Sequence, residues 1–79
     1  MSPTIYQEAG FRYYFFSREE ARMHVHVSHA DGGAKFWLEP RIELAKNNRL
    51  SAAQLKQIEN SIRRHQHELI SAWQYHFRN

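Results

Sequence analysis

The segment Met23–Pro40, MHVHVSHADGGAKFWLEP, decides the fold because it has the pattern of a β-hairpin. In a strand, successive side chains point to opposite faces. The first half of the segment divides accordingly into an apolar row of Met23, Val25 and Val27 and a polar row of His24, His26 and Ser28. Asp31-Gly32 then predicts a two-residue loop, since a type I′ turn needs positive φ at both central positions.

This turn implies a register for the two strands. If Ala30 faces Gly33, the inner face pairs Val27 with Phe36 and Val25 with Leu38. The outer pairs are then Ser28 with Lys35, His26 with Trp37, and His24 with Glu39. A slip of one residue would mix the two faces, which favours this pairing. We therefore expect one outer row that contains His24, His26, Lys35, Trp37 and Glu39.

The length of 79 residues predicts one small domain, of a size at which a single core is only marginally sufficient. A content of 42% hydrophobic and 14% aromatic residues indicates a folded chain and not a disordered one. The chain has no cysteine, which excludes disulfides and thiolate metal sites. Its chemistry therefore has to come from histidines, carboxylates and hydroxyls, and we expect no cofactor.

The charge and the hydropathy pattern indicate a compartment and classes of partner. The N-terminal stretch MSPTIYQEAG has no basic region followed by an apolar run, and no segment approaches the roughly 18 apolar residues of a membrane span. We therefore expect a cytoplasmic protein with no membrane contact. A net charge of +3 is compatible with an acidic protein partner or with nucleic acid, and is too small to choose between them.

The rest of the sheet is predicted from the flanking sequence. Two strands over residues 4–8 and 11–17 are expected around Ala9-Gly10, and the hairpin supplies strands over residues 23–29 and 34–38. Residues 42–45 are either a short fifth strand or a helical turn, after which Asn47-Asn48 is expected to break the element. Large rings at both parities of residues 11–17 predict that both faces of that strand are covered.

A helix over residues 52–77 is predicted to follow. Ser51 and Gln54 have the spacing of a capping box at its start. An apolar stripe along it contains Leu55, Ile58, Ile62, Leu69, Trp73 and Phe77. The predicted fold is therefore α+β, an antiparallel meander of four to five strands with one long C-terminal helix packed on one face.

The predicted helix is longer than the sheet beneath it. It would extend about 40 Å at 1.5 Å per residue, whereas a strand of about six residues spans only about 20 Å. The distal half around Trp73 and Phe77 is thus expected to overhang the sheet. We interpret these two side chains as a partner interface, formed with a second copy of the chain or with another protein.

His24 and His26 are the candidate catalytic residues. Two imidazoles on one side of a strand, about 7 Å apart, can relay protons, act as a general base, grip a phosphate or share a metal. A metal needs a third ligand, for which Glu39 is the natural candidate and His29 has the wrong parity. The alternative is a half-exposed layer with Trp37 and Glu39 that only stabilises the sheet. We predict no metal, and the sequence leaves open whether the chain is an enzyme.

Lys35, Trp37 and Glu39 are the candidate binding residues. A cation and a flat ring on a sheet face are typical of several RNA binders, although no RNP-like signature is present. Alternatively, Trp37 docks a protein, since tryptophan is enriched at interface hot spots. Binding to RNA would weaken steeply with salt, whereas protein association mostly would not. No glycine-rich phosphate loop, nucleophile elbow, HExxH or CxxC motif is present.

The chain contains, in order, FRYYFFS, a short charged loop, RMHVHV, GGAKFWLEP, and LSAAQL opening a helix that ends near AWQYHF. With this order, nearly the whole chain resembles the small bacterial domain-of-unknown-function family 4160. The matching positions are His24, His26, Lys35, Trp37 and Pro40, while Met23 stands where a proline frequently precedes the first histidine. The resemblance implies the toxin of a type II toxin–antitoxin pair, neutralised by a small antitoxin-like protein encoded nearby, and it implies no defined reaction.

Overall fold

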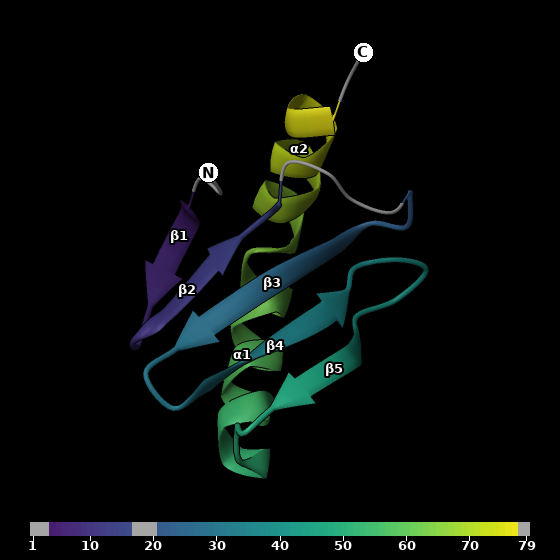
Figure 1. The fold of residues 1–79 in the computed structure, drawn as a ribbon. Helices are drawn as coiled ribbons and strands as arrows, with labels where there is room; N and C mark the ends of the chain where they lie inside the picture. The colour runs from purple at the N-terminus through teal and green to yellow at the C-terminus, as the bar shows by residue number, and fades with distance from the viewer. Residues whose placement is uncertain (1–3, 17–20, 78–79) are drawn as a thin grey trace.

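The computed structural model describes residues 4–16 and 21–77. The strands are β1 (Thr4–Glu8), β2 (Phe11–Tyr14), β3 (His24–His29), β4 (Gly32–Trp37) and β5 (Glu43–Asn48), and the helices are α1 (Ala52–Arg64) and α2 (Gln66–Phe77). The strands form one antiparallel sheet in the order β1-β2-β3-β4-β5. Both helices lie on one face of it (Figure 1), which confirms the α+β meander with a helical layer on one side.

The strand bounds differ from the prediction mainly at two places. β2 ends at Tyr14, before the predicted end at Ser17, which lies outside the described residues. The segment predicted as a fifth strand or a helical turn is a strand, and it continues through Asn47 and Asn48. Those two residues pair with Ala34 and Gly33, so the predicted break comes only after them.

The β1–β2 connection is a two-residue turn. Glu8 pairs with Phe11, and the two loop residues have φ of 54° at Ala9 and 84° at Gly10. Positive φ at both central positions is the geometry of a type I′ turn, whose twist matches that of the flanking strands. A glycine at the second position adopts this conformation without steric cost.

The β3–β4 register differs from the predicted one by two residues. His29 pairs with Gly32, so the loop is Ala30-Asp31 and not Asp31-Gly32, and Val25 pairs with Phe36 and not with Leu38. Among the described non-glycine residues, positive φ occurs at Ala9 and Arg49, so this loop is not the predicted type I′ turn. A shift by an even number of residues preserves the two faces. The predicted alternation of inner and outer residues along β3 and β4 is therefore correct, although the individual pairs are not and His24 of the predicted outer row is fully buried.

Gly32 explains the register because it is needed inside the sheet. A Cβ atom built on it would lie 2.0 Å from the backbone oxygen of Asn48 in β5. The turn next to it is fixed instead by its own hydrogen bonds. The Asp31 amide donates to Nδ1 of His29 at 3.0 Å, and the Asp31 carboxylate accepts from the side chain of Gln54 at 2.9 Å.

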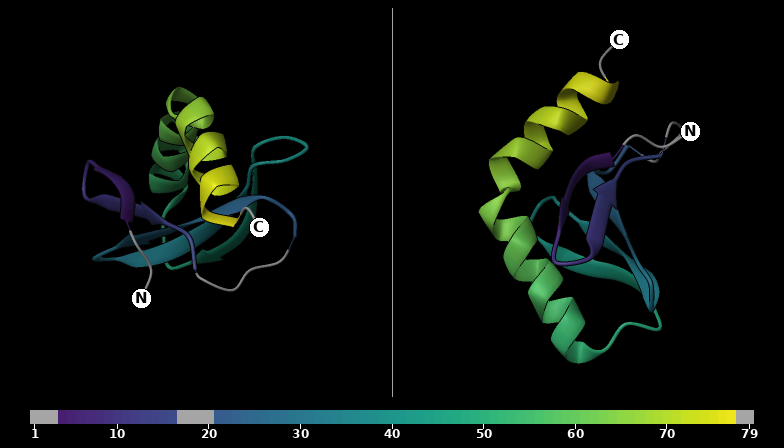
Figure 2. Two further views of the ribbon diagram at one scale, coloured as in Figure 1. Left: turned by 90° about the horizontal axis from the view of Figure 1, so that it is seen from above. Right: turned by 90° about the vertical axis from the view of Figure 1, so that its left-hand side faces the viewer.

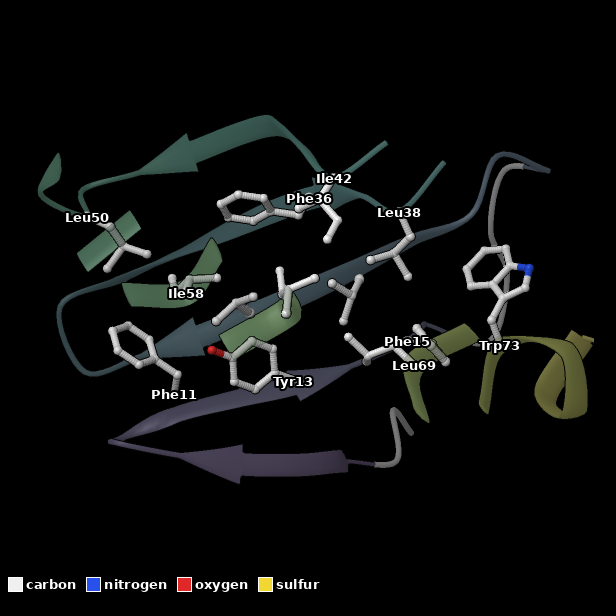
Figure 3. Packing of buried hydrophobic residues seen from close by; sticks show 13 residues of the cluster. Phe11, Tyr13, Phe15, Phe36, Leu38, Ile42, Leu50, Ile58, Leu69 and Trp73 are labelled. Atoms are coloured by element: carbon white, nitrogen blue, oxygen red, sulfur yellow. The ribbon is translucent and has the colours of Figure 1, made fainter. Parts of the chain in front are cut away.

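The core lies between the helices and the inner face of the sheet (Figure 3). Along β2 and the two residues after it, Phe11, Tyr13 and Phe15 are buried, whereas Tyr14 and Phe16 point to the other face. The prediction that both faces of this strand are covered is therefore wrong. The buried hydrophobic residues are Phe11, Tyr13, Phe15, Val25, Val27, Phe36, Leu38, Ile42, Leu50, Ile58, Ile62, Leu69 and Trp73.

The capping box is confirmed at the start of α1. The Gln54 amide donates to Oγ of Ser51 at 3.1 Å, and the Ser51 amide donates to the Gln54 side chain at 2.9 Å. Each bond satisfies a backbone or side-chain group that the first helical turn leaves without an intrahelical partner. The prediction of a helix start at this position is therefore correct.

The single long helix of the prediction is wrong, because the helix breaks at His65. The backbone there has φ −107° and ψ 15°, outside helical values. The ring of His65 lies against the ring of Tyr6 in β1, with 4.2 Å between centroids, and its Nε2 lies 3.5 Å from Glu8. These contacts tie the break to the edge of the sheet, and the two helices meet at an angle (Figure 2).

The bend also removes the predicted overhang. Trp73 is only 8% exposed and packs edge-on against Phe15, with 5.2 Å between centroids. Phe77 is partly buried and lies 4.2 Å from Trp73. The distal helix thus covers the end of its own sheet, because α2 leans back over it. No helix in the described part of the chain is long and apolar enough to cross a membrane.

Candidate functional site

The outer face of the sheet is the candidate functional site. The helices leave this face uncovered (Figure 1). Since side chains alternate along each strand, β2 to β5 all send residues to it. The basic and aromatic residues on this face are Arg12, Tyr14, Phe16, Arg22, His26, Lys35, Trp37 and Lys46.

A hollow of about 350 Å³ lies on this face. Its lining comes from four strands and from the residues after β2, and consists of Tyr14, Phe16, His26, Val27, Gly33, Ala34, Lys35, Lys46 and Asn48. Gly33 has no side chain, and Ala34 packs against the core on the inner face, so the space between the larger neighbours stays open. Among the described residues that line it, Lys35 and Lys46 are cationic and none is acidic.

Three rings form one wall of the hollow. The Tyr14 and His26 rings are stacked at 5.6 Å, and the Phe16 ring lies 4.3 Å from His26. Phe16 meets Tyr14 edge-on at 5.4 Å and is 43% exposed. Aromatic groups at such distances hold each other in place, so the wall is preorganised.

Cations lie over the rings next to the hollow. The guanidinium of Arg12 lies 4.4 Å from the centroid of the Tyr14 ring. The guanidinium of Arg22 and the amine of Lys35 lie 4.1 Å and 4.6 Å from the centroid of Trp37. Arg22 also forms an ion pair with Glu43 at 3.8 Å. The rings thus keep several positive charges at the surface of this face.

His24, one of the candidate catalytic residues, is fully buried. Its Nδ1 lies 2.7 Å from the carbonyl oxygen of Arg22, and because a carbonyl only accepts, Nδ1 carries a proton. The ring contacts His26 at 5.1 Å, Trp37 at 5.7 Å and Trp73 of α2 at 5.1 Å. His24 therefore connects the outer face to the helical layer, while His26 alone of the pair lines the hollow.

Glu39 is not opposite His24, as the predicted register required, because His24 pairs with Trp37. The carboxylate of Glu39 accepts a hydrogen bond from the Met23 amide at 2.9 Å. The structure therefore brings together His26, Lys35 and Trp37 of the predicted site. Among the described residues, no three histidine or carboxylate side chains gather in a way that would hold a metal ion.

The predicted partner residues lie elsewhere. Trp73 is in the core and Phe77 is partly buried beside it. Their role as an interface with another chain stays a prediction.

A second polar cluster lies where β1 meets the helix break. Tyr6 and Ser61 are joined through their hydroxyls at 3.1 Å, and Arg64 donates to Glu8 at 2.6 Å. Hydrogen bonds from Ser61, His65 and Arg64 lower the pKa of Glu8 below its ordinary value. Burial raises the pKa of Tyr6. Tyr6 and Glu8 belong to β1, whereas Ser61 and Arg64 belong to α1 and His65 lies at the break, so this cluster is a clasp between β1 and the helices.

The sequence prediction missed several residues that line the hollow. Tyr14 and Phe16 share the parity that faces outward, but large rings at both parities predict a strand that is covered on both faces. Lys46 and Asn48 lie beyond the predicted end of the fifth segment, at residue 45. Strand parity read to the end of β5 would have placed Lys46 beside Lys35, with which it pairs.

Comparison with protein families finds a match over most of the chain. Residues 10–74 match the family described as Domain of unknown function (DUF4160). These residues include β2 to β5, α1, and α2 up to residue 74. The match therefore includes every described residue that lines the hollow. The same comparison finds no match among curated proteins and none among solved structures.

Proposed function

This chain belongs to the DUF4160 family, and we propose that it binds single-stranded nucleic acid on the outer face of its sheet. RNA is the expected ligand. The observation that supports this proposal is the hollow in which Tyr14 and His26 stand beside Lys35 and Lys46. Exposed rings stack on bases, and amines neutralise phosphates. A ligand that contains both bases and phosphates uses the aromatic rings and the amines together, and a nucleic acid is such a ligand.

The geometry of the rings favours a single-stranded nucleic acid over a duplex. The ring of Tyr14 in β2, and the ring of Phe16 that lies against it, belong to a sheet surface and not to a projecting helix that would enter a groove. Sheet surfaces with aromatic residues bind unpaired bases, whose faces are accessible, whereas paired bases are stacked within a helix. We therefore expect single strands to bind more tightly than duplexes.

The charges indicate how binding depends on salt. Arg12, Arg22, Lys35 and Lys46 stand on this face, and Glu43 offsets the charge of Arg22. Each phosphate contact contributes about 0.7 to the slope of log affinity against log salt for a single strand. Three to four contacts therefore predict a slope of roughly −2 to −3.

Binding of a fluorescently labelled RNA oligomer by anisotropy, at rising salt, tests this function. The double variant Lys35→Ala, Lys46→Ala is expected to weaken binding and to reduce the slope by about 1.4, the value for two phosphate contacts. Lys56→Ala is the matched control, because Lys56 is exposed on α1 behind the sheet. No binding by the wild-type protein at low salt, or an equal loss in the control, would exclude the proposal. Single-stranded DNA and duplex RNA, tested in parallel, show whether the face prefers RNA to DNA and single strands to duplexes.

A second candidate function is the toxin half of a toxin–antitoxin pair, acting in the bacterial cytoplasm and neutralised by a small partner protein. The observation in its favour is the exposure of Phe16, an apolar ring that lines the hollow. Exposed apolar groups beside a functional surface fit a protein that covers them. In this proposal the partner blocks the face that binds RNA.

Expression of the chain in bacteria tests the toxin role. Wild-type protein is expected to slow growth, and His26→Ala with Lys35→Ala is expected to relieve the effect, whereas Lys56→Ala is not. His24 is left intact because its burial makes it a folding residue. Growth unaffected by the wild-type chain, without its genomic neighbour, would exclude the toxin role and leave RNA binding to be decided by the anisotropy experiment.

A further inference from the structure

Building on the proposed RNA binding, we propose that the hollow holds one unpaired base against the wall of Tyr14, Phe16 and His26, while Trp37 only positions the cations that bind the adjacent phosphates. The outer face would then have two parts with separate tasks. One part recognises a base, and the other holds the backbone. The two tasks are measurable separately, because loss of base stacking and loss of phosphate contacts change different quantities.

The hollow has the properties of a base site. Its volume of about 350 Å³ is near the lower end of the sites that hold small molecules, which run from about 300 to 1,000 Å³. That volume suits one flat ring system and is small for a stack of bases. Tyr14 and Phe16 supply the ring surfaces, and Asn48 supplies an amide that can donate to and accept from a base edge.

The phosphates adjacent to such a base fall near the amines. Lys35 and Lys46 pair with each other across β4 and β5 and both line the hollow. A base seated beside Tyr14 therefore has its own backbone within reach of two cations from neighbouring strands. No acidic side chain among the described lining residues opposes this charge.

Trp37 differs from the rings of the wall in two respects. It does not appear among the described residues lining the hollow, and two cations, Arg22 and Lys35, lie over its ring, whereas one, Arg12, lies over Tyr14. A base would have to displace those cations before it could stack there. We therefore assign Trp37 as a positioning residue that holds Arg22 and Lys35 for the phosphates.

The test compares two probes of the same length and charge. One is an RNA oligomer of about ten nucleotides, within the site sizes of single-strand binders. The other has the same backbone with every base removed. The ratio of the two affinities measures the contribution of the bases, and the salt slope of each measures the phosphate contacts. A third probe restores one central base.

Wild-type protein is expected to bind the normal oligomer about 5- to 150-fold more tightly than the abasic one, the range for loss of a stacked base. The probe with a single base should recover most of this difference. Tyr14→Ala should bring the ratio close to one and lower the salt slope by no more than about 0.7, the value for the single cation, Arg12, that lies over its ring. Trp37→Ala should leave the ratio unchanged and lower both affinities together. Tyr75→Ala, on the exposed side of α2, is the matched control for loss of a tyrosine.

Each outcome decides one of the two proposals. Binding that depends on salt but not on bases would overturn the base site and leave the proposed function standing. A ratio lost in Trp37→Ala and kept in Tyr14→Ala would show that the base stacks on Trp37, and would also overturn the inference. No binding of either probe at low salt would exclude the proposed function itself. Circular dichroism and urea unfolding confirm that each variant is folded before it is scored.

Discussion

Aromatic side chains stand on both faces of this sheet, but the two faces bury them differently. On the inner face, Tyr13 and Phe36 lie under the helices and are almost inaccessible to water. On the outer face, Tyr14 and Trp37, their direct neighbours in the chain, remain partly exposed and have cations over their rings. The same strands therefore build a core on one side and a charged aromatic surface on the other.

The burial of a ring, and not its residue type, therefore distinguishes the core of this sheet from its surface. A ring on the inner face contributes by removing apolar area from water. A ring on the outer face gains less from burial and more from its contacts with arginine and lysine.

The sharpest test of this comparison is a pair of substitutions at adjacent residues. Phe36→Ala is expected to lower the free energy of unfolding by about 3–5 kcal/mol, the usual cost of a buried ring. That is a large share of the stability of a small domain. Trp37→Ala, which faces the other way, is expected to cost only about 1 kcal/mol. Urea denaturation measures both, and equal losses would show that the outer face is as structural as the inner one.

The next test concerns the edge of the sheet that supplies Lys46 and Asn48. Gly32→Ala places a methyl group where the backbone oxygen of Asn48 lies, so β5 has to move away. We expect a loss of about 1–3 kcal/mol, the range for overpacking. Gly33→Ala is the matched variant, because its Cβ would lie 3.0 Å from the oxygen of Val27, and should cost less. Hydrogen exchange should show faster exchange of β5 amides in the first variant, and unchanged exchange would contradict the close contact.

The smallest expected effect is in the clasp between β1 and the helices, and it depends on pH. The pKa of Glu8 is lower in the folded chain than its ordinary value of 4.5. Such a group stabilises the fold above its unfolded pKa, and the contribution is lost as pH falls through the folded pKa. The difference in unfolding free energy between wild type and Glu8→Gln should therefore be largest near neutrality and shrink toward pH 3. Glu43→Gln, on β5, is the matched control, and a difference independent of pH would refute the role of the Glu8 charge.

The division into two faces was predictable because strand parity is a local property. Val25 and Val27 on one side and His26 with Lys35 on the other follow from alternation alone. The register of β3 and β4 was not predictable from the sequence. Gly32 has to be a glycine because the backbone oxygen of Asn48, which is distant in sequence, lies against it. A turn motif such as Asp31-Gly32 is informative only when its glycine is not required elsewhere.

The helix break and the hollow lay outside what the sequence predicts for similar reasons. Neither proline nor glycine interrupts residues 52–77, so nothing local marks His65. Its contacts with Tyr6 and Glu8 exist only once β1 lies beside the helices. The hollow requires side chains from several strands in their final register, which a local pattern does not supply.

The buried imidazole of His24 gives the molecule an internal reporter. Both tryptophans of the chain contact that single ring, Trp37 from the sheet and Trp73 from the helical layer. A ligand that shifts His26 pushes on His24 and so alters the surroundings of two indoles at once. Unlabelled protein should therefore signal occupancy through its intrinsic fluorescence, including from an indole that the ligand never touches.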